Sequence, residues 1–228
     1  EADVILVNTC GFIESAKTEA IENILEACSY KQVNPNLKVV VTGCLAERYR
    51  SQIEEEIPEV DAVVGCASNK AIDSIVARLF SGEEHLESYG LKKDFPLGGK
   101  RVIGTPAHYA YLKIAEGCNN RCHYCAIPGI RGPLRSREMA DCVAEARWLA
   151  GEGVKELIIV AQDPTAYGED WGKPGSICEL LDKLNRIDGI QWIRIMYAYP
   201  ERITDEFIAA MKRNEKVLSY IDLPIQHC

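Results

Sequence analysis

Residues 111–125 read Tyr-Leu-Lys-Ile-Ala-Glu-Gly-Cys-Asn-Asn-Arg-Cys-His-Tyr-Cys, a strand-like run that leads into a cysteine-rich loop. Residues 111–115 predict a β-strand, and the loop carries Cys118, Cys122 and Cys125 in the spacing C-x3-C-x2-C. Three thiolates within eight residues can close on one centre, and thiolates favour iron–sulfur clusters or zinc. We therefore predict a metal centre at the end of this strand.

The number of cysteines in this loop favours an iron–sulfur cluster over zinc. A structural zinc site normally takes four ligands, often as two C-x2-C pairs, whereas this loop offers three cysteines with no fourth close by. A 4Fe–4S cluster on three cysteines leaves one iron open for an external ligand, just as catalytic metals keep one coordination position open. A zinc half-site or a redox pair is the alternative interpretation.

Strand-like runs alternate with helical patterns on the carboxyl side of this loop. The expected strands cover residues 156–161, 192–197 and 220–225, and the expected helices cover 137–150, 176–186 and 204–213. Thr204 is expected to cap the last of these helices. Together with residues 111–115, these segments make four strands and three helices, which predicts the start of a (β/α) barrel.

The amino-terminal third alternates in the same way. Apolar runs predict strands at 4–7, 38–42 and 62–64, and helices are expected at about 15–30, 46–56 and 68–80. Ser15 is expected to cap the first helix. Continuous apolar strands separated by helices indicate a doubly wound parallel sheet. We thus expect an α/β chain with one domain at 1–82, a linker at 83–108 and a partial, truncated barrel at 109–228.

Composition narrows the classes of protein that remain. Lys and Arg total 26 against 34 Asp and Glu, and the net charge of −8 suits a basic protein or a small substrate better than a nucleic acid. No apolar run approaches the roughly 20 residues of a membrane span, and none reads as a secretory leader. The ten cysteines are therefore expected to be reduced thiols of a cytoplasmic protein. We expect the chain to be the central portion of a longer enzyme.

Motifs around the cysteine loop and near the amino end resemble one enzyme family. They are Glu116-Gly117-Cys118, Ala126-Ile127-Pro128-Gly129-Ile130-Arg131-Gly132, Asn8-Thr9-Cys10-Gly11-Phe12-Ile13 and Thr42-Gly43-Cys44-Leu45-Ala46-Glu47-Arg48. Together they resemble the radical S-adenosylmethionine (SAM) methylthiotransferases over nearly the whole chain. This resemblance implies a transferase that uses SAM and two 4Fe–4S clusters.

The resemblance also implies roles for particular residues. The catalytic cluster, which binds and cleaves SAM, would be held by Cys118, Cys122 and Cys125. The expected cofactor contacts are Tyr124, near the adenine, and Gln162 and Gln226, which follow barrel strands.

The second cluster would be auxiliary and would lie in the amino-terminal domain. The resemblance implies Cys10 and Cys44 as two of its ligands, while the family's third cysteine lies on a strand that this chain lacks. Spacing alone suggests Cys66 as the third ligand, because all three cysteines follow strands of one parallel sheet. The alternative is that Cys66 is a small buried residue with no ligand role.

The family divides by substrate. Gly-Phe-Ile after Cys10 and Ala-Ile-Pro after Cys125 resemble the branch that modifies the β-carbon of an aspartate in a small-subunit ribosomal protein. The net negative charge of the chain also favours this branch, since ribosomal proteins are basic. The alternatives are the branch that modifies a tRNA adenosine and, from another class, a non-catalytic electron-transfer module, which would be expected to carry four cysteines per cluster. The resemblance further implies a flavodoxin- or ferredoxin-type electron donor, and we expect no membrane partner.

Overall fold

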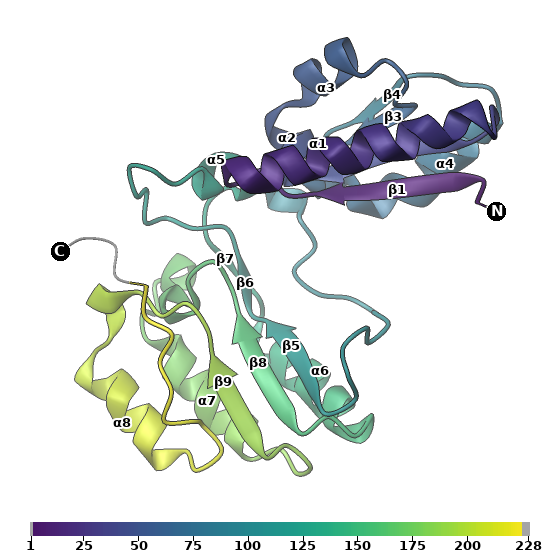
Figure 1. The fold of residues 1–228 in the computed structure, drawn as a ribbon. Helices are drawn as coiled ribbons and strands as arrows, with labels where there is room; N and C mark the ends of the chain where they lie inside the picture. Colours follow the sequence, from purple (N-terminus) through teal and green to yellow (C-terminus); the bar gives the residue numbers. More distant parts are fainter. Residues whose placement is uncertain (1, 225–228) are drawn as a thin grey trace. The chain divides into compact units, whose positions relative to one another are not determined.

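The computed structural model of the protein describes residues 2–224 and divides the chain into two compact units (Figure 1). Unit 1 comprises Glu1–Phe95 and Arg121–Gly132, and unit 2 comprises Pro96–Asn120 and Pro133–Cys228. Each unit has its own parallel sheet and its own buried core. The α/β fold class predicted from the sequence is confirmed.

Unit 1 is built on a four-stranded parallel sheet. Its strands, in chain order and in sheet order, are β1 (Val4–Thr9), β2 (Lys38–Gly43), β3 (Ala62–Val64) and β4 (Leu86–Ser88). The three successive valines of β2 are fully buried, because elements pack on both faces of the sheet. The register pairs Thr9 with Gly43 and Thr42 with Val64, so the carboxyl ends of β1, β2 and β3 lie along one edge.

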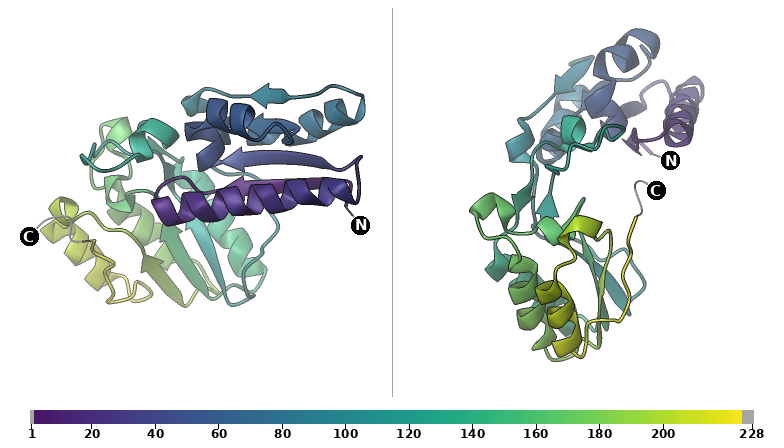
Figure 2. Two further views of the ribbon diagram at one scale, coloured as in Figure 1. Left: turned by 45° about the horizontal axis from the view of Figure 1, so that its top comes forward. Right: turned by 90° about the vertical axis from the view of Figure 1, so that its left-hand side faces the viewer.

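Helices lie on both faces of this sheet, as a doubly wound fold requires. The helices are α1 (Glu14–Ser29), α2 (Cys44–Arg48), α3 (Arg50–Glu56), α4 (Ile72–Phe80) and α5 (Ile127–Arg131), and the 3-10 turns are η1 (Tyr30–Gln32), η2 (Cys66–Ala71) and η3 (Lys92–Asp94). Ile24 of α1 packs with Val39 and Val41 on one face, whereas Leu79 of α4 packs with Val40 on the other. Figure 2 shows α1 running along the sheet.

Two expectations about the helices of unit 1 are wrong. The first helix begins at Glu14 with Ile13 at its N-cap position, so Ser15 lies inside the first turn and does not cap the helix. The helix expected at 46–56 is two helices, because the backbone of Tyr49 leaves helical geometry with φ −125° and ψ 32°.

Unit 2 is built on a three-stranded parallel sheet in the order β5-β8-β9. Its strands are β5 (Tyr109–Lys113), β6 (Ala115–Glu116), β7 (Arg135–Ser136), β8 (Glu156–Val160) and β9 (Trp192–Ile195), of which β6 and β7 form a separate antiparallel pair. Leu112, Leu157 and Ile193 are fully buried in the core, whereas Tyr111 on the opposite face of β5 is exposed. One face of this sheet is therefore covered and the other is more open.

Helices supply the cover on the buried face of unit 2 (Figure 1). They are α6 (Met139–Gly151), α7 (Ser176–Asn185) and α8 (Asp205–Arg213), with the 3-10 turns η4 (Pro164–Ala166), η5 (Glu169–Trp171) and η6 (Pro200–Arg202). The predicted cap of the last helix is confirmed, since Thr204 Oγ1 accepts the Phe207 N–H at 3.2 Å. Strands and helices alternate as the partial barrel predicts.

The fourth strand expected in this sheet is only begun. Ile193 of β9 forms an isolated parallel bridge with Val217, and the Leu218 N–H donates to the Ile193 carbonyl at 2.9 Å. Residues 220–224 are not in a strand, and residue 225 lies outside the described part of the chain.

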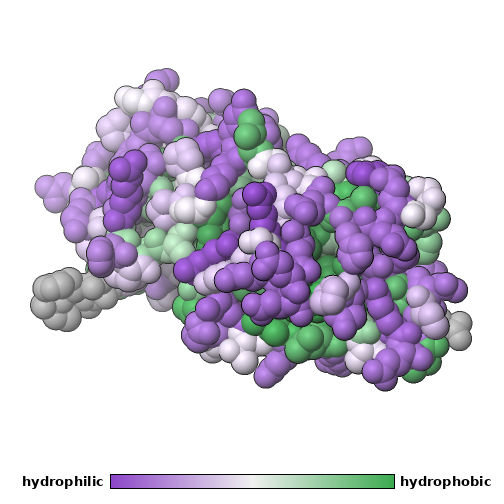
Figure 3. All heavy atoms as spheres, turned by 90° about the horizontal axis from the view of Figure 1, so that it is seen from above, coloured by the Kyte–Doolittle hydropathy of each residue, from purple (hydrophilic) through white to green (hydrophobic). Residues whose placement is uncertain are grey.

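The face of the molecule drawn in Figure 3 is covered mainly by hydrophilic residues, with hydrophobic ones showing in small areas between them. Among the residues that the structure describes, none of the helices combines the length and the apolar character that crossing a membrane requires.

Candidate functional site

Three cysteines of unit 1 follow neighbouring strands of its sheet. Cys10 comes directly after β1, Cys44 directly after β2, and Cys66 two residues after β3. Parallel sheets place their functional groups at such carboxyl ends. The three differ in exposure, because Cys10 is exposed while Cys44 and Cys66 are buried.

Glycines allow the backbone segments at these strand ends to approach closely. Gly43 has a left-handed backbone with φ 101°, and a Cβ there would lie 2.3 Å from the Thr9 carbonyl oxygen. A Cβ on Gly11 would lie 2.9 Å from the backbone of Leu45. Glycine is therefore needed beside Cys10 and Cys44, because only a residue without a side chain lets the end of β1 lie against the start of α2.

Cys44 and Cys66 form a buried thiol pair. Both pack with Phe95 and Ile130 in one small cluster, and the Cys44 side chain is a hydrogen-bond partner of Cys66. That hydrogen bond, followed by burial, raises the pKa of the Cys66 thiol well above its ordinary value. Both groups would have to lose a proton before they could bind a metal as thiolates.

Arg131 places a positive charge on this thiol pair. Its Nη2 donates to Cys44 Sγ at 3.2 Å, and its guanidinium lies 5.4 Å from the centre of the Phe95 ring. The positive charge of this guanidinium partly opposes the rise in the pKa of Cys66. In the sequence Arg131 is only one residue of the motif that follows the cysteine loop, and nothing local indicates its partner 87 residues earlier.

The C-x3-C-x2-C loop begins in unit 2 and continues in unit 1. Cys118, Cys122 and Cys125 are all partly exposed. The Asn120 N–H donates to Cys118 Sγ at 3.5 Å, and the Cys125 N–H donates to the Cys122 carbonyl at 2.9 Å. Partial desolvation, followed by the neighbouring Cys122, raises the pKa of the predicted adenine contact Tyr124, whose side chain is exposed.

Within the described residues 2–224, no three side chains of His, Cys, Asp or Glu are gathered tightly enough to hold a metal ion. The donor chemistry of the loop nevertheless fits an iron–sulfur cluster, because three accessible thiols lie within eight residues and one already accepts a backbone N–H. Such N–H donors to sulfur are part of how proteins tune these clusters.

Gln162, a predicted cofactor contact, holds the start of the cysteine loop. Its Oε1 accepts the Gly117 N–H at 2.8 Å, and its Nε2 donates to Glu116 Oε1 at 3.1 Å. Glu116 is 1% exposed and also forms an ion pair with Lys113. The other predicted barrel contact, Gln226, lies outside the described residues.

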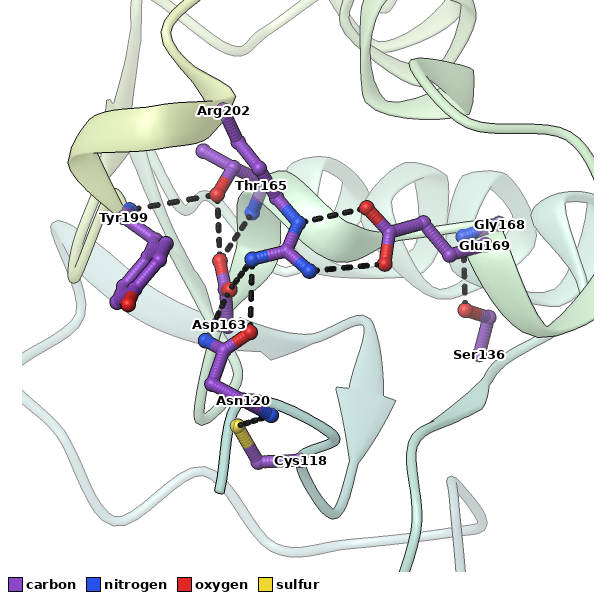
Figure 4. Close-up of polar contacts among 9 residues, drawn as sticks. All are labelled: Cys118, Asn120, Ser136, Asp163, Thr165, Gly168, Glu169, Tyr199 and Arg202. Atoms are coloured by element: carbon purple, nitrogen blue, oxygen red, sulfur yellow. Dashed lines mark hydrogen bonds and ion pairs between the residues drawn. The ribbon is translucent and has the colours of Figure 1, made fainter. Parts of the chain in front are cut away.

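Beside Cys118, polar side chains from three strand ends form a connected network, which we call the Arg202 network (Figure 4). Its members are Asn120, which follows β6, Asp163 and Glu169, which follow β8, and Arg202, which follows β9. Arg202 Nη1 donates to Asn120 Oδ1 at 2.8 Å and to Asp163 Oδ2 at 3.0 Å. Its Nε and Nη2 donate to the two carboxylate oxygens of Glu169 at 2.6 and 3.0 Å. These charge-assisted bonds pull the Arg202 pKa above its ordinary value, and the Cys118 thiol adds to that effect.

Asp163 is the buried anchor of the Arg202 network. It is 2% exposed, it accepts the Thr165 N–H at 3.1 Å, and it accepts the Asn120 amide at 2.8 Å. Sequence reasoning singled out the neighbouring Gln162 and missed the roles of Asn120, Glu169 and Arg202. Only the fold brings them together, since Arg202 lies 82 residues from Asn120.

Comparison with known proteins identifies the class to which this site belongs. Residues 112–228, just over half of the chain, match the sequence model of the Radical SAM superfamily, and the chain belongs to that superfamily. Residues 1–84 match the model described as Uncharacterized protein family UPF0004. A solved structure of the radical SAM methyltransferase TsrM from Kitasatospora setae superposes with a TM-score of 0.69 and 12% identity, covering 98% of this chain and 48% of that one. At that identity the likeness shows the fold alone.

Curated relatives identify the family more narrowly than the superfamily match does. The chain is 50% identical over 234 residues to "Ribosomal protein uS12 methylthiotransferase RimO" from Acetivibrio thermocellus. It is 49% identical over 228 residues to the protein of that name from Clostridioides difficile and 51% identical over 229 residues to the one from Clostridium tetani. Each alignment covers 100% of this chain and 51% of the relative, so the chain spans about half the length of the curated relatives it matches. The resemblance to methylthiotransferases predicted from the motifs is confirmed.

Proposed function

We propose that this chain carries the radical-generating part and the sulfur-donating part of a ribosomal protein uS12 methylthiotransferase. This transferase adds a methylthio group to the β-carbon of an aspartate. The observation that carries the proposal is the match of about 50% identity over the whole chain to several proteins of that name. The C-x3-C-x2-C loop at a strand end of the radical SAM unit agrees with it.

The catalytic cluster would be held by Cys118, Cys122 and Cys125. Bound there, a 4Fe–4S cluster supplies the electron for reductive cleavage of SAM to a carbon radical. The chain itself contributes three deprotonated thiols, the Asn120 N–H that donates to Cys118 Sγ, and the orientation of the loop. Tyr124, Gln162 and Gln226 stay predictions as SAM contacts.

The auxiliary 4Fe–4S cluster would use Cys10 and Cys44, which end adjacent strands of unit 1. Its third ligand is either a cysteine beyond the amino end of this chain or Cys66. The contact between Cys44 and Cys66 supports Cys66 as a neighbour of this site. Iron analysis of Cys66→Ala beside Cys10→Ala distinguishes the two, since equal iron loss identifies Cys66 as a ligand and unchanged iron removes it.

The proposed substrate is tested by direct competition. The full-length protein, reduced anaerobically with SAM, is given uS12 and tRNA side by side, and mass spectrometry follows methylthiolation of each. We expect modification of the uS12 aspartate alone, in keeping with an acidic chain that meets a basic substrate. Methylthiolation of tRNA alone would replace the proposal by the activity of the family branch that modifies a tRNA adenosine.

The electron donor of the proposed reaction would be a flavodoxin or ferredoxin, since the reaction needs one electron from outside the chain. The protein would act in the cytoplasm, where its thiols stay reduced. The domain boundaries would be 1–82 and 109–228, joined by the linker at 83–108.

A further inference from the structure

We propose that Arg202 is a positioning residue for the cluster loop: it fixes Asn120, and through Asn120 the backbone beside Cys118, to the ends of the two neighbouring barrel strands. This inference rests on the proposed role of Cys118 as a cluster ligand. It adds to that role a residue that lies 84 positions further along the chain than Cys118.

The geometry of Arg202 gives it three separate anchors. One nitrogen bridges Asn120 Oδ1 and Asp163 Oδ2 at 2.8 and 3.0 Å, and the other two face the Glu169 carboxylate as a fork. Asp163 also accepts the Asn120 amide at 2.8 Å, so Asn120 is held at both ends of its side chain. Figure 4 shows these contacts converging beside Cys118.

Asn120 transmits this restraint to the ligand. Its side chain belongs to the network, while its own backbone N–H points at Cys118 Sγ with a separation of 3.5 Å. With its side chain clamped, the Asn120 peptide has little freedom to rotate away from the sulfur. The position of Asn120 beside Cys118 is therefore fixed by contacts within the protein itself, and contacts of this kind orient metal ligands.

Arg202 also adds charge at this point. Its guanidinium forms an ion pair with Asp163 at 3.0 Å and a second with Glu169 at 2.6 Å, so the positive charge is fixed in place beside the loop. Lysine cannot reproduce this arrangement, because a single ammonium lacks the planar fork that serves Asn120, Asp163 and Glu169 together. Arg202→Lys therefore keeps the charge and loses the positioning.

The chain offers a matched control in Arg213. This arginine likewise forms a fork with a carboxylate, Asp182, at 2.9 and 2.9 Å, and a further bond to Glu206 at 3.0 Å. It lies at the end of α8, away from Cys118, so its loss removes comparable bonds without touching the loop.

The experiment compares Arg202→Gln, Arg202→Lys and Arg213→Gln in the full chain, each reconstituted anaerobically with iron and sulfide. It measures the rate of iron release to a chelator and the EPR spectrum of the reduced cluster with and without SAM. Loss of a contact that orients a metal ligand lowers metal affinity about 10- to 100-fold. Both Arg202 variants should therefore release iron about tenfold faster than wild type and show an altered spectrum. Arg213→Gln should match wild type in both.

Two outcomes separate this inference from the proposed function. If wild type itself binds no cluster that responds to SAM, the proposed function fails. If wild type responds and Arg202→Gln releases iron at the wild-type rate with an unchanged spectrum, the positioning role is wrong. Full rescue by Arg202→Lys would also overturn it, because charge alone would then suffice. Circular dichroism melting of each variant identifies any that fails to fold, and Asn120→Ala then serves as the second probe of the same link.

Discussion

The two units end their parallel strands in opposite chemical ways. In unit 1 the ends of β2 and β3 carry Cys44 and Cys66, buried thiols in an apolar cluster with the pKa of Cys66 raised. In unit 2 the strand ends carry the Arg202 network, in which charged side chains are already paired. One edge is thus lined by protonated thiols in a small apolar cluster, whereas the other edge carries charged side chains held by ion pairs and hydrogen bonds.

The largest effect is expected at the cysteine loop. Cys118→Ala should remove the catalytic cluster, because two remaining thiols cannot complete the site, while Cys178→Ala should leave iron content unchanged. Cys178 is the matched control since it is buried in α7 as a small apolar group. Iron and sulfide analysis after anaerobic reconstitution checks both. Equal iron in the two variants would contradict the assignment of Cys118.

The next largest effect, on stability, is expected in the Arg202 network. Asp163→Ala removes a 2% exposed carboxylate and leaves Arg202 partly uncompensated, so we expect a loss of about 3 kcal/mol in the free energy of unfolding. Asp182→Ala removes a carboxylate from the more exposed Arg213 pair and should cost about 1 kcal/mol or less. Denaturant titration of both variants measures the difference. Similar losses would show that the network does not stabilise unit 2.

The third effect, also on stability, is expected where the ends of β1 and β2 lie close together in unit 1. Gly43→Ala should cost about 2–3 kcal/mol, because its Cβ meets the Thr9 carbonyl at a backbone with positive φ. Gly82 also has positive φ, at 96°, but its Cβ would meet nothing within 4 Å. Gly82→Ala should therefore cost only about 1 kcal/mol from backbone strain. Thermal melting that ranks Gly82→Ala as the more damaging change would refute the close-packing argument.

The smallest effect concerns thiol reactivity. Because the pKa of Cys66 is raised, its thiol stays protonated as pH rises from 7 to 9, and burial shields it further. Iodoacetamide in that range should label the exposed Cys10 first and Cys66 last. Mass spectrometry of tryptic peptides at several pH values gives the order. Early labelling of Cys66 would mean that unit 1 opens at this edge.

Much of the fold was open to prediction from the sequence. The continuous apolar run of β2 predicted a sheet covered on both faces, since only buried strands lack polar alternation. Helix boundaries were harder. The first helix begins one residue before the expected Ser15 cap, and a departure from helical backbone at Tyr49 splits a single expected helix.

The site was only partly predictable. The cysteines were visible because metal ligands cluster in the sequence at short spacing, as in the loop at 118–125. The contacts that surround them were not, because Arg131 reaches Cys44 across 87 residues and Arg202 reaches Asn120 across 82. The residues on either side of such an arginine give no indication of a partner so far away in the chain.

The central claim is that the loop beginning at Cys118 belongs to a centre that cleaves SAM. The most direct measurement is chromatographic detection of 5′-deoxyadenosine after anaerobic reconstitution, reduction with dithionite and addition of SAM. We expect 5′-deoxyadenosine from wild type and from Cys178→Ala, and none from Cys118→Ala. A wild-type protein that carries its full iron and sulfide and yields no 5′-deoxyadenosine would contradict the claim.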